Sequence, residues 1–210
     1  VVDGSGSMAG TKIDMARKVA VLLLESLGSF QETMNMEYRL KEPFKTDTEV
    51  RAFGDGDTLA MPFHEGRPTH DVRIAKFKAL DQMRADKGGT RDAPSFEVIE
   101  ESLRPRANLL KAGKAKELVL YIADGGSFTA TASAEAIRQI QAHGAVCKGL
   151  LVAGASDDDR KTFFSMFGTH GAEVPDVAKL GEVVARLLAE EIEKTVILVS
   201  KYEDAGAEEL

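Results

Sequence analysis

The sequence predicts an α/β protein with a doubly wound, Rossmann-like architecture, in which a mainly parallel central sheet carries helices on both faces. Strand-length apolar runs alternate with segments of helical periodicity along the 210-residue chain. Such alternation is typical of right-handed strand–helix–strand crossovers. The run from Leu118 to Ala123 is apolar throughout and is followed by an acid and two glycines, which is the pattern of a strand buried on both faces.

The first helix is predicted to begin at Thr11, where Asp14 three residues later gives a capping-box pattern, and to end at Gly28. A strand is expected next, over residues 34–40. Apolar residues cover so much of the helix circumference that we expect it to be buried against the sheet. They are Ile13, Ala16, Val19, Ala20, Leu23, Leu24 and Leu27.

A hairpin is predicted in the next part of the chain. Its strands are residues 49–53 and 59–63, and the turn between them is Gly54-Asp55-Gly56-Asp57. Asp and Gly are residues that turns prefer, so we interpret Asp55 and Asp57 as turn residues, with a second cation site as the alternative.

Helices and strands continue to alternate to the end of the chain. A helix is expected over 69–83, and Pro94 directly after Asp92-Ala93 indicates the start of another, which Arg104-Pro105 ends. The remaining predicted elements are a helix over 134–142 stopped by Gly144, a strand over 146–153, a helix over 157–166 capped by Ser156, a strand near Val174, a helix over 179–192, a strand-like segment over 195–200, and an acidic, mobile tail over 201–210.

Composition excludes several classes of function. Lys and Arg number 27 against 34 Asp and Glu, a formal charge of -7, so we expect neither a nucleic-acid-binding nor an anionic-membrane-binding surface. No signal peptide or membrane span is visible, and the single cysteine, Cys147, lies in an apolar run and is expected to be a buried thiol. A cytoplasmic location is therefore expected. Only two residues precede Asp3, so we also expect residues upstream of Val1.

The first residues contain a motif suited to a hard cation. Asp3-Gly4-Ser5-Gly6-Ser7 places one carboxylate and two hydroxyls on a glycine-rich turn directly after the apolar pair Val1-Val2. Oxygen ligands of this kind favour Mg²⁺, with Mn²⁺ or Ca²⁺ as alternatives. Asp124 stands at the end of the buried strand, and Thr90 follows two glycines. If the strands of the two acids are neighbours, these residues converge at the carboxyl edge of the sheet.

Together these residues resemble the von Willebrand factor type A domain. Its metal-ion-dependent adhesion site has the pattern D-x-S-x-S, then a threonine in a later loop, then an aspartate after a central strand, and Asp3, Ser5, Ser7, Thr90 and Asp124 match it in order. The resemblance covers residues 1–194 as one domain. It leaves residues 195–210 as an extension, a candidate edge strand and acidic tail.

The resemblance implies a binding module. Asp3, Ser5, Ser7 and Thr90 would be direct ligands of the metal, and Asp124 would act through water or in one conformation only. An open coordination position would accept a Glu or Asp from a protein partner. Arg91 and Asp92 are expected to border the site and tune the partner's approach. Intracellular bacterial relatives with few cysteines resemble the chain best, and many of them work beside ring ATPases of the MoxR or chelatase kind, which makes an AAA+ ATPase the expected partner.

Catalysis has little support in the sequence. The four histidines have no H-x-x-x-H or H-E-x-x-H spacing, and no G-x-S-x-G elbow follows a strand. We therefore expect no catalytic residue. The alternative is a Mg²⁺-dependent phosphoryl-transfer or hydrolytic enzyme that uses Asp3, although Ser5 stands where such an enzyme would carry a second acid.

Overall fold

A computed structural model describes residues 1–38, 43–66 and 83–207, with single residues 69, 71, 74, 78 and 80 between the last two ranges. They form a six-stranded sheet with the order β3-β2-β1-β4-β5-β6. Only β2 and β3 pair antiparallel, and the other neighbours are parallel, which confirms the predicted fold class. The strands are β1 (Val2–Asp3), β2 (Asp47–Phe53), β3 (Asp57–Glu65), β4 (Leu118–Ala123), β5 (Val146–Val152) and β6 (Gly171–Val174).

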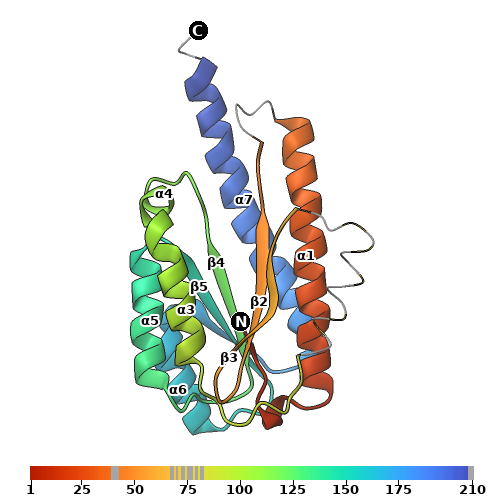
Figure 1. Cartoon of the computed structure of the whole chain (residues 1–210), viewed down its shortest axis with the longest axis vertical. Coiled ribbons are helices and arrows are strands. Elements are labelled where there is room, and N and C mark those ends of the chain that lie inside the picture. The colour runs from red at the N-terminus through yellow and green to blue at the C-terminus, as the bar shows by residue number, and fades with distance from the viewer. Residues whose placement is uncertain are drawn as a thin grey trace.

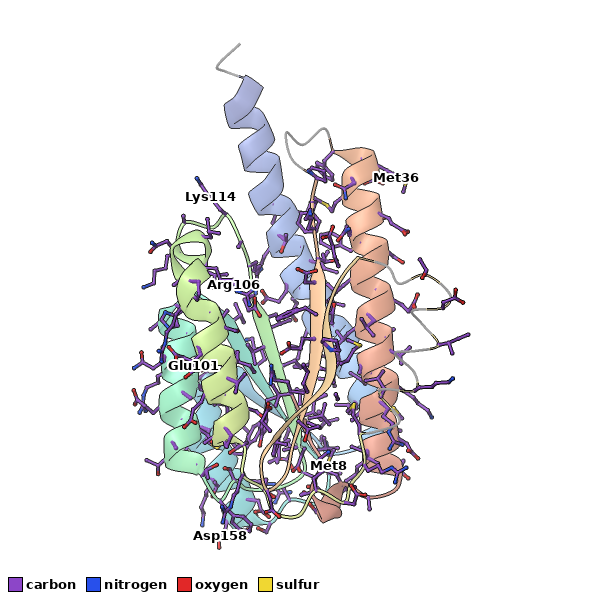
Figure 2. The ribbon with its side chains drawn as sticks, in the orientation of Figure 1. Met8, Met36, Glu101, Arg106, Lys114 and Asp158 are labelled. Carbon is purple, nitrogen blue, oxygen red and sulfur yellow. The ribbon has the colours of Figure 1, made fainter. Side chains whose placement is uncertain are left out.

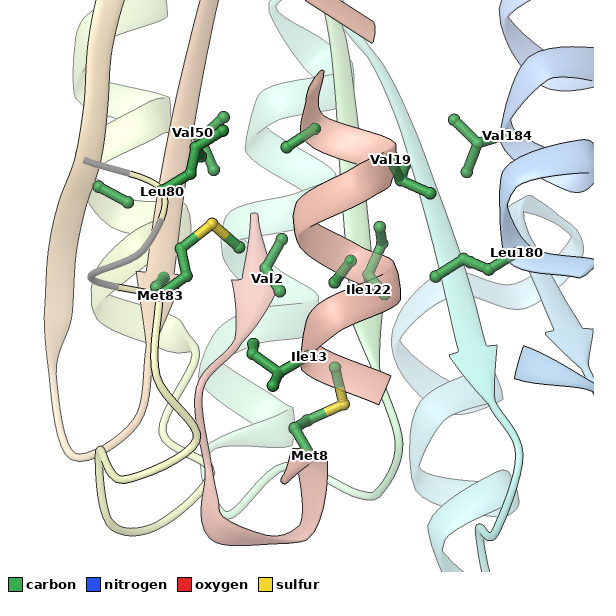
Figure 3. Close-up of a cluster of buried hydrophobic side chains, with 14 of the residues drawn as sticks. Val2, Met8, Ile13, Val19, Val50, Leu80, Met83, Ile122, Leu180 and Val184 are labelled. Carbon is green, nitrogen blue, oxygen red and sulfur yellow. The ribbon is translucent and has the colours of Figure 1, made fainter. Parts of the chain in front are cut away.

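Helices cover both faces of the sheet (Figure 1). One face carries α1 (Thr11–Glu37) and α7 (Leu180–Ala207), and the other carries α3 (Ala93–Leu103), α4 (Ala107–Lys111), α5 (Ala130–Ala142) and α6 (Asp157–Phe167). Each face has its own buried cluster. Figure 3 shows the first of them, in which Val19 of α1 and Leu180 of α7 lie near Ile122 of β4.

The second cluster is built around stacked aromatic rings. Tyr121 of β4 stacks on Phe53 of β2 at a centroid distance of 5.3 Å and on Phe96 of α3 at 5.4 Å. Phe167 of α6 completes the cluster, with its ring 5.1 Å from Tyr121 and 5.0 Å from Phe163. Burial of such rings supplies much of the energy that holds α3 and α6 against the sheet.

The first helix is longer than predicted. α1 ends at Glu37, so the strand expected over 34–40 is wrong for the described residues 34–38. Gly28 lies inside the helix, and Met34 is buried on the core-facing side of α1, so packing of that side outweighs the local helix-stop signal. The capping prediction is also wrong: Gly10, at a φ of 76°, precedes the helix and Thr11 is its first residue, without a side-chain capping bond.

The C-terminal edge strand is also wrong. Residues 195–200 belong to α7, which continues as one helix to Ala207. No glycine or proline interrupts the chain from 182 to 205, and the Thr195 hydroxyl donates to the Glu191 carbonyl at 2.8 Å, a bond that a helix accommodates. Helical continuation therefore overrides the strand preference of the β-branched residues in this segment.

Most other predicted elements are confirmed with small shifts of their ends. Ser156 caps α6 through a full capping box with Asp159, and Gly144, at a φ of 97°, follows the end of α5. The helix predicted over 69–83 falls largely outside the described residues. The short helix α4 was not predicted. Cys147 is buried as expected, and no helix in the described part of the chain has the length and apolarity needed to cross a bilayer.

Candidate metal centre

The carboxyl ends of β1 and β4 meet at the point where the strand order reverses. β1 pairs with β2 on one side and β4 on the other, and Val2 lies opposite Ile122. Asp3 ends β1 and Asp124 directly follows β4, so the two carboxylates occupy neighbouring positions at the edge where open α/β sheets bind ligands. Figure 2 shows Met8 at this end of the molecule and Met36 at the other.

Hydrogen bonds join the first loop to the end of β4. The Ser5 amide donates to Asp3 Oδ1 at 2.7 Å, the Ser5 and Ser7 hydroxyls lie 2.9 Å apart, and the Ser7 hydroxyl donates to Asp124 Oδ1 at 2.7 Å. Met8, which is fully buried, anchors the loop in the core. The structure thus brings four of the five predicted ligands into one hydrogen-bonded chain.

The loop that carries Thr90 is held beside this cluster by backbone hydrogen bonds, and no bond from the Thr90 side chain to the cluster is seen in the described residues. The Lys87 amide donates to the Gly4 carbonyl at 3.0 Å, and the Phe128 amide donates to the Thr90 carbonyl at 2.9 Å. The first bond fixes the Thr90 loop to the Asp3 loop, and the second fixes it to the loop after β4. All three predicted loops therefore converge at one edge of the sheet.

Asp55 lies in the turn between β2 and β3, whereas Asp57 is the first residue of β3. Asp55 accepts a hydrogen bond from the Gly89 amide at 2.9 Å. At Gly88, with a φ of 82°, an added Cβ would lie 1.9 Å from the Asp55 carboxylate, so only glycine fits there. Asp57 pairs with Arg51 at 2.5 Å. The turn interpretation is therefore confirmed for Asp55 and wrong for Asp57, and Asp55 also holds the glycines that precede Thr90.

The carboxylate of Asp3 is buried and has one oxygen without a partner. Its side chain is fully buried, and Oδ2 has no hydrogen-bond partner. Burial raises the pKa of Asp3 from 3.8 to about 6, hydrogen bonds from Ser5 oppose the shift, and repulsion from Asp124 and Asp92 adds to it. A buried carboxylate oxygen without a donor is costly unless a cation meets it.

The residues fit a hard divalent cation. Within the described ranges, no group of three or more His, Cys, Asp and Glu side chains is placed to hold an ion. The cluster at the sheet edge offers carboxylate and hydroxyl oxygens instead, the donors that Mg²⁺, Mn²⁺ and Ca²⁺ take. The free oxygen of Asp3 supplies the position for such an ion.

Asp92 has a role that the sequence did not suggest. It is fully buried and accepts hydrogen bonds from the hydroxyls of Tyr121, Ser127, Thr129 and Ser133. Burial, with the nearby Asp92 charge, raises the pKa of Tyr121 well above 10, so the phenol stays a donor. Asp92 therefore ties the Thr90 loop to β4 and α5 from inside. Asp92 lies close enough to Asp3 for its charge to raise the pKa of Asp3, but it is buried, so it has no surface to offer a partner, whereas Arg91 is exposed.

Lys12 is a second residue that the sequence reasoning missed. Its Nζ lies 2.5 Å from Asp124 Oδ2 and 3.4 Å from the Ser7 carbonyl oxygen. A signal was available, because the first turn of a helix that directly follows a ligand loop lies close to that loop. A lysine one residue into α1 is therefore within reach of the same carboxylates.

Comparisons with known proteins bear on the fold. No protein-family profile matches the sequence. An uncharacterized protein of Treponema pallidum is 26% identical over 171 residues, which are 80% of this chain and 29% of that protein. Among solved structures, a von Willebrand factor type A protein from Catenulispora acidiphila superposes with a TM-score of 0.55 at 18% identity, over 91% of this chain and 41% of that one.

Two further similar structures hold a metal ion. Proximal thread matrix protein 1 of the mussel byssus, with a zinc-occupied adhesion-site motif, has a TM-score of 0.57 at 14% identity and covers 88% of this chain and 45% of its own. Manganese-loaded TRAP of Plasmodium vivax has a TM-score of 0.54 at 14% identity, over 87% of this chain and 69% of that one.

The chain spans less than half the length of the first of these structures and under a third of the Treponema protein. Sequence identities below one fifth in the solved structures carry information on the fold and not on the activity. The strand order, the helices on both faces and the superpositions agree with one another. The described chain has the von Willebrand factor type A fold.

Proposed function

We propose that this chain is a divalent-cation-dependent protein-binding module. Asp3, Ser5, Ser7 and Thr90 would hold the ion, with Asp124 acting through water, and the ion would supply positive charge to a Glu or Asp carboxylate of a partner. The observation that carries the proposal is the buried, unpartnered Asp3 Oδ2 beside the hydroxyl chain of Ser5 and Ser7. Mg²⁺ is the proposed ion, because oxygen donors at a water-exchanging site suit it.

An enzyme that uses Asp3 is less well supported. Asp3 has no exposed surface, and its Oδ1 accepts the Ser5 amide, so attack of this carboxylate on a phosphate ester would first require the loop to open. A steady turnover of p-nitrophenyl phosphate that needs Mg²⁺ and disappears with Asp3→Ala would favour the enzyme over the binding module.

The double variant Ser5→Ala/Ser7→Ala tests the site. Two hydroxyl ligands disappear, together with the hydrogen bond that orients Asp124, so we expect affinity for Mg²⁺ and Mn²⁺ to fall by about 100-fold or more. Calorimetry on chelator-stripped protein measures this loss. Ser29→Ala, at an exposed serine of α1, is the matched control and should leave uptake unchanged.

Folding provides the second readout of that experiment. The apolar clusters on the two faces of the sheet are complete without an ion, so the circular-dichroism spectrum of the double variant should equal that of wild type. Equal metal uptake by wild type and a correctly folded double variant would remove the site assignment, and with it the proposed function.

Phe128 is a candidate contact for the partner. Its side chain is 78% exposed, and its amide donates a hydrogen bond to the Thr90 carbonyl. An exposed apolar ring therefore lies next to the loop of one predicted metal ligand. Aromatic residues beside a central polar anchor often dominate binding energy. We expect Phe128→Ala to weaken binding of an acidic peptide, selected on the Mn²⁺-loaded protein, by about tenfold, with metal uptake unchanged.

Met36→Ala is the control for that prediction. Met36 is 79% exposed and lies at the opposite end of the molecule (Figure 2), so its loss should not alter peptide affinity. Peptide binding that survives both Phe128→Ala and EDTA would place the interaction surface elsewhere.

The class of partner is the last part of the proposal. We propose a cytoplasmic ring ATPase of the MoxR or chelatase kind, which would present an acidic residue to the open coordination position of the bound ion. The chain has one cysteine and so forms no internal disulfide, which is compatible with the cytoplasm. Co-purification of such an ATPase with the chain in Mg²⁺, and its release by EDTA, is the expected result.

A further inference from the structure

Lys12 connects α1 to two of the predicted metal ligands, Ser7 and Asp124. Its ammonium reaches from the first turn of the helix to Asp124, at 2.5 Å, and to the Ser7 carbonyl, at 3.4 Å. The loop after β5 leaves room for it: at Gly154, with a φ of 105°, an added Cβ would lie 3.2 Å from Lys12 Nζ. The side chain of Lys12 is 26% exposed and that of Asp124 is 1% exposed, so this ion pair is largely shielded from water.

The two acids of the cluster are therefore in opposite situations. Asp124 has both oxygens engaged, Oδ1 by the Ser7 hydroxyl and Oδ2 by Lys12. Asp3 has one oxygen engaged, and the other is buried without a partner. Asp3 Oδ2 therefore has no protein partner to give up when a cation binds, whereas the charge of Asp124 is already neutralised by Lys12.

We propose that Lys12 limits the affinity of the site for its metal and so keeps the bound ion dependent on a carboxylate from the partner. This inference rests on the proposed function. A positive charge in contact with a ligand carboxylate repels a divalent cation and keeps Asp124 from contacting the ion directly. The ion then holds only one close protein carboxylate, Asp3. A partner's carboxylate supplies the negative charge that Asp124 does not.

Removing the charge of Lys12 should strengthen metal binding. Lys12→Met keeps an apolar stem of similar length but removes the charge, so Asp124 becomes free to bind the ion, and Mn²⁺ affinity should rise at least tenfold, which equals about 1.4 kcal/mol. Lys12→Arg keeps the charge and should stay close to wild type. Lys18→Met, at an exposed lysine of the same helix, loses the same net charge away from the site and should change affinity by less than about twofold.

A double variant isolates the mechanism. In Asp124→Asn the carboxylate that Lys12 neutralises is gone, so adding Lys12→Met to it should yield much less of the tightening seen in the wild-type background. Mn²⁺ binding to chelator-stripped protein, followed by calorimetry and by the electron paramagnetic resonance signal of free Mn²⁺, measures all of these variants. Circular dichroism checks that each variant is folded, and Lys12→Gln replaces Lys12→Met if the latter is not.

The outcomes separate this inference from the proposed function. A wild-type protein that takes up no Mn²⁺ would overturn both. Uptake by wild type with equal or weaker affinity in folded Lys12→Met would overturn the role of Lys12 and leave the metal-dependent binding module standing. Tightening in Lys12→Met that persists in full in the Asp124→Asn background would also overturn it, because Lys12 would then act by a general field and not through Asp124.

Discussion

Asp3→Asn is expected to abolish divalent-cation uptake and, at the same time, to stabilise the metal-free protein by about 1–2 kcal/mol near pH 7. Burial holds the pKa of Asp3 at about 6 in place of 3.8, and a shift of that size corresponds to about 3 kcal/mol of cost for the ionised form. Asparagine removes the charge and can keep the bond from the Ser5 amide. Its buried amide group lacks an acceptor, which offsets part of the gain.

The pH dependence gives the sign of this effect. Between the unfolded pKa near 3.8 and the folded pKa of about 6, the folded state binds more protons at Asp3 than the unfolded state. The free energy of unfolding contributed by Asp3 therefore falls as pH rises through this window and is constant above it. Metal-stripped wild type should lose stability over that range relative to Asp3→Asn.

Urea unfolding of both proteins, without metal, at several values between about pH 4.5 and 7.5 measures the difference. The two curves should approach each other at the acid end and separate toward neutrality. An Asp3→Asn variant that is less stable than wild type at neutral pH would mean that the Asp3 carboxylate is not under electrostatic strain. The main support for a cation at this position would then be lost.

Phe167→Ala is expected to have the largest effect on folding. Phe167 is 3% exposed, and its ring lies against those of Phe96, Tyr121 and Phe163. Removing a ring from this cluster leaves a cavity and should cost about 3–5 kcal/mol. For a domain of this size the melting temperature should fall by on the order of 10 °C.

Phe164→Ala is the matched control on the same helix. Phe164 is 38% exposed and contacts the edge of Phe163, so its loss should cost about 1 kcal/mol. Thermal unfolding followed by circular dichroism compares the two. Equal losses in the two variants would contradict the assignment of Phe167 to the centre of the aromatic cluster.

Sequence patterns predicted what depends on short segments of the chain. The apolar run at β4 and the D-x-S-x-S turn each carry their signal within a few residues, and the fold class and the convergence of the metal loops follow from them. Helix ends were predicted less well. Met34 is buried in the part of α1 beyond Gly28, and burial depends on tertiary packing that a local sequence pattern does not contain.

The rest of the site was missed for the same reason. Lys12 and Asp124 are 112 residues apart, and Asp92 accepts from Ser133, which is 41 residues away. The place of Lys12 in the first turn after the Asp3 loop is a local signal, but no local pattern identifies the partner of Lys12 or of Asp92, because lysines in first turns and acids before helices are common on any surface. Only the packing of α1 and α5 against β4 turns these ordinary residues into an ion pair and a buried carboxylate.

Helix α7 has a practical consequence for handling this protein. It begins at Leu180, which belongs to the same buried cluster as Met8, and runs to the far end of the sheet and beyond it (Figure 1). Its 28 residues correspond to a length of about 42 Å. A biotin or fluorophore attached at Ala207 would lie at the end of the molecule opposite the loops that carry the predicted metal ligands. Protein immobilised on a sensor surface through that end would keep the predicted metal-binding loops accessible to a partner in solution.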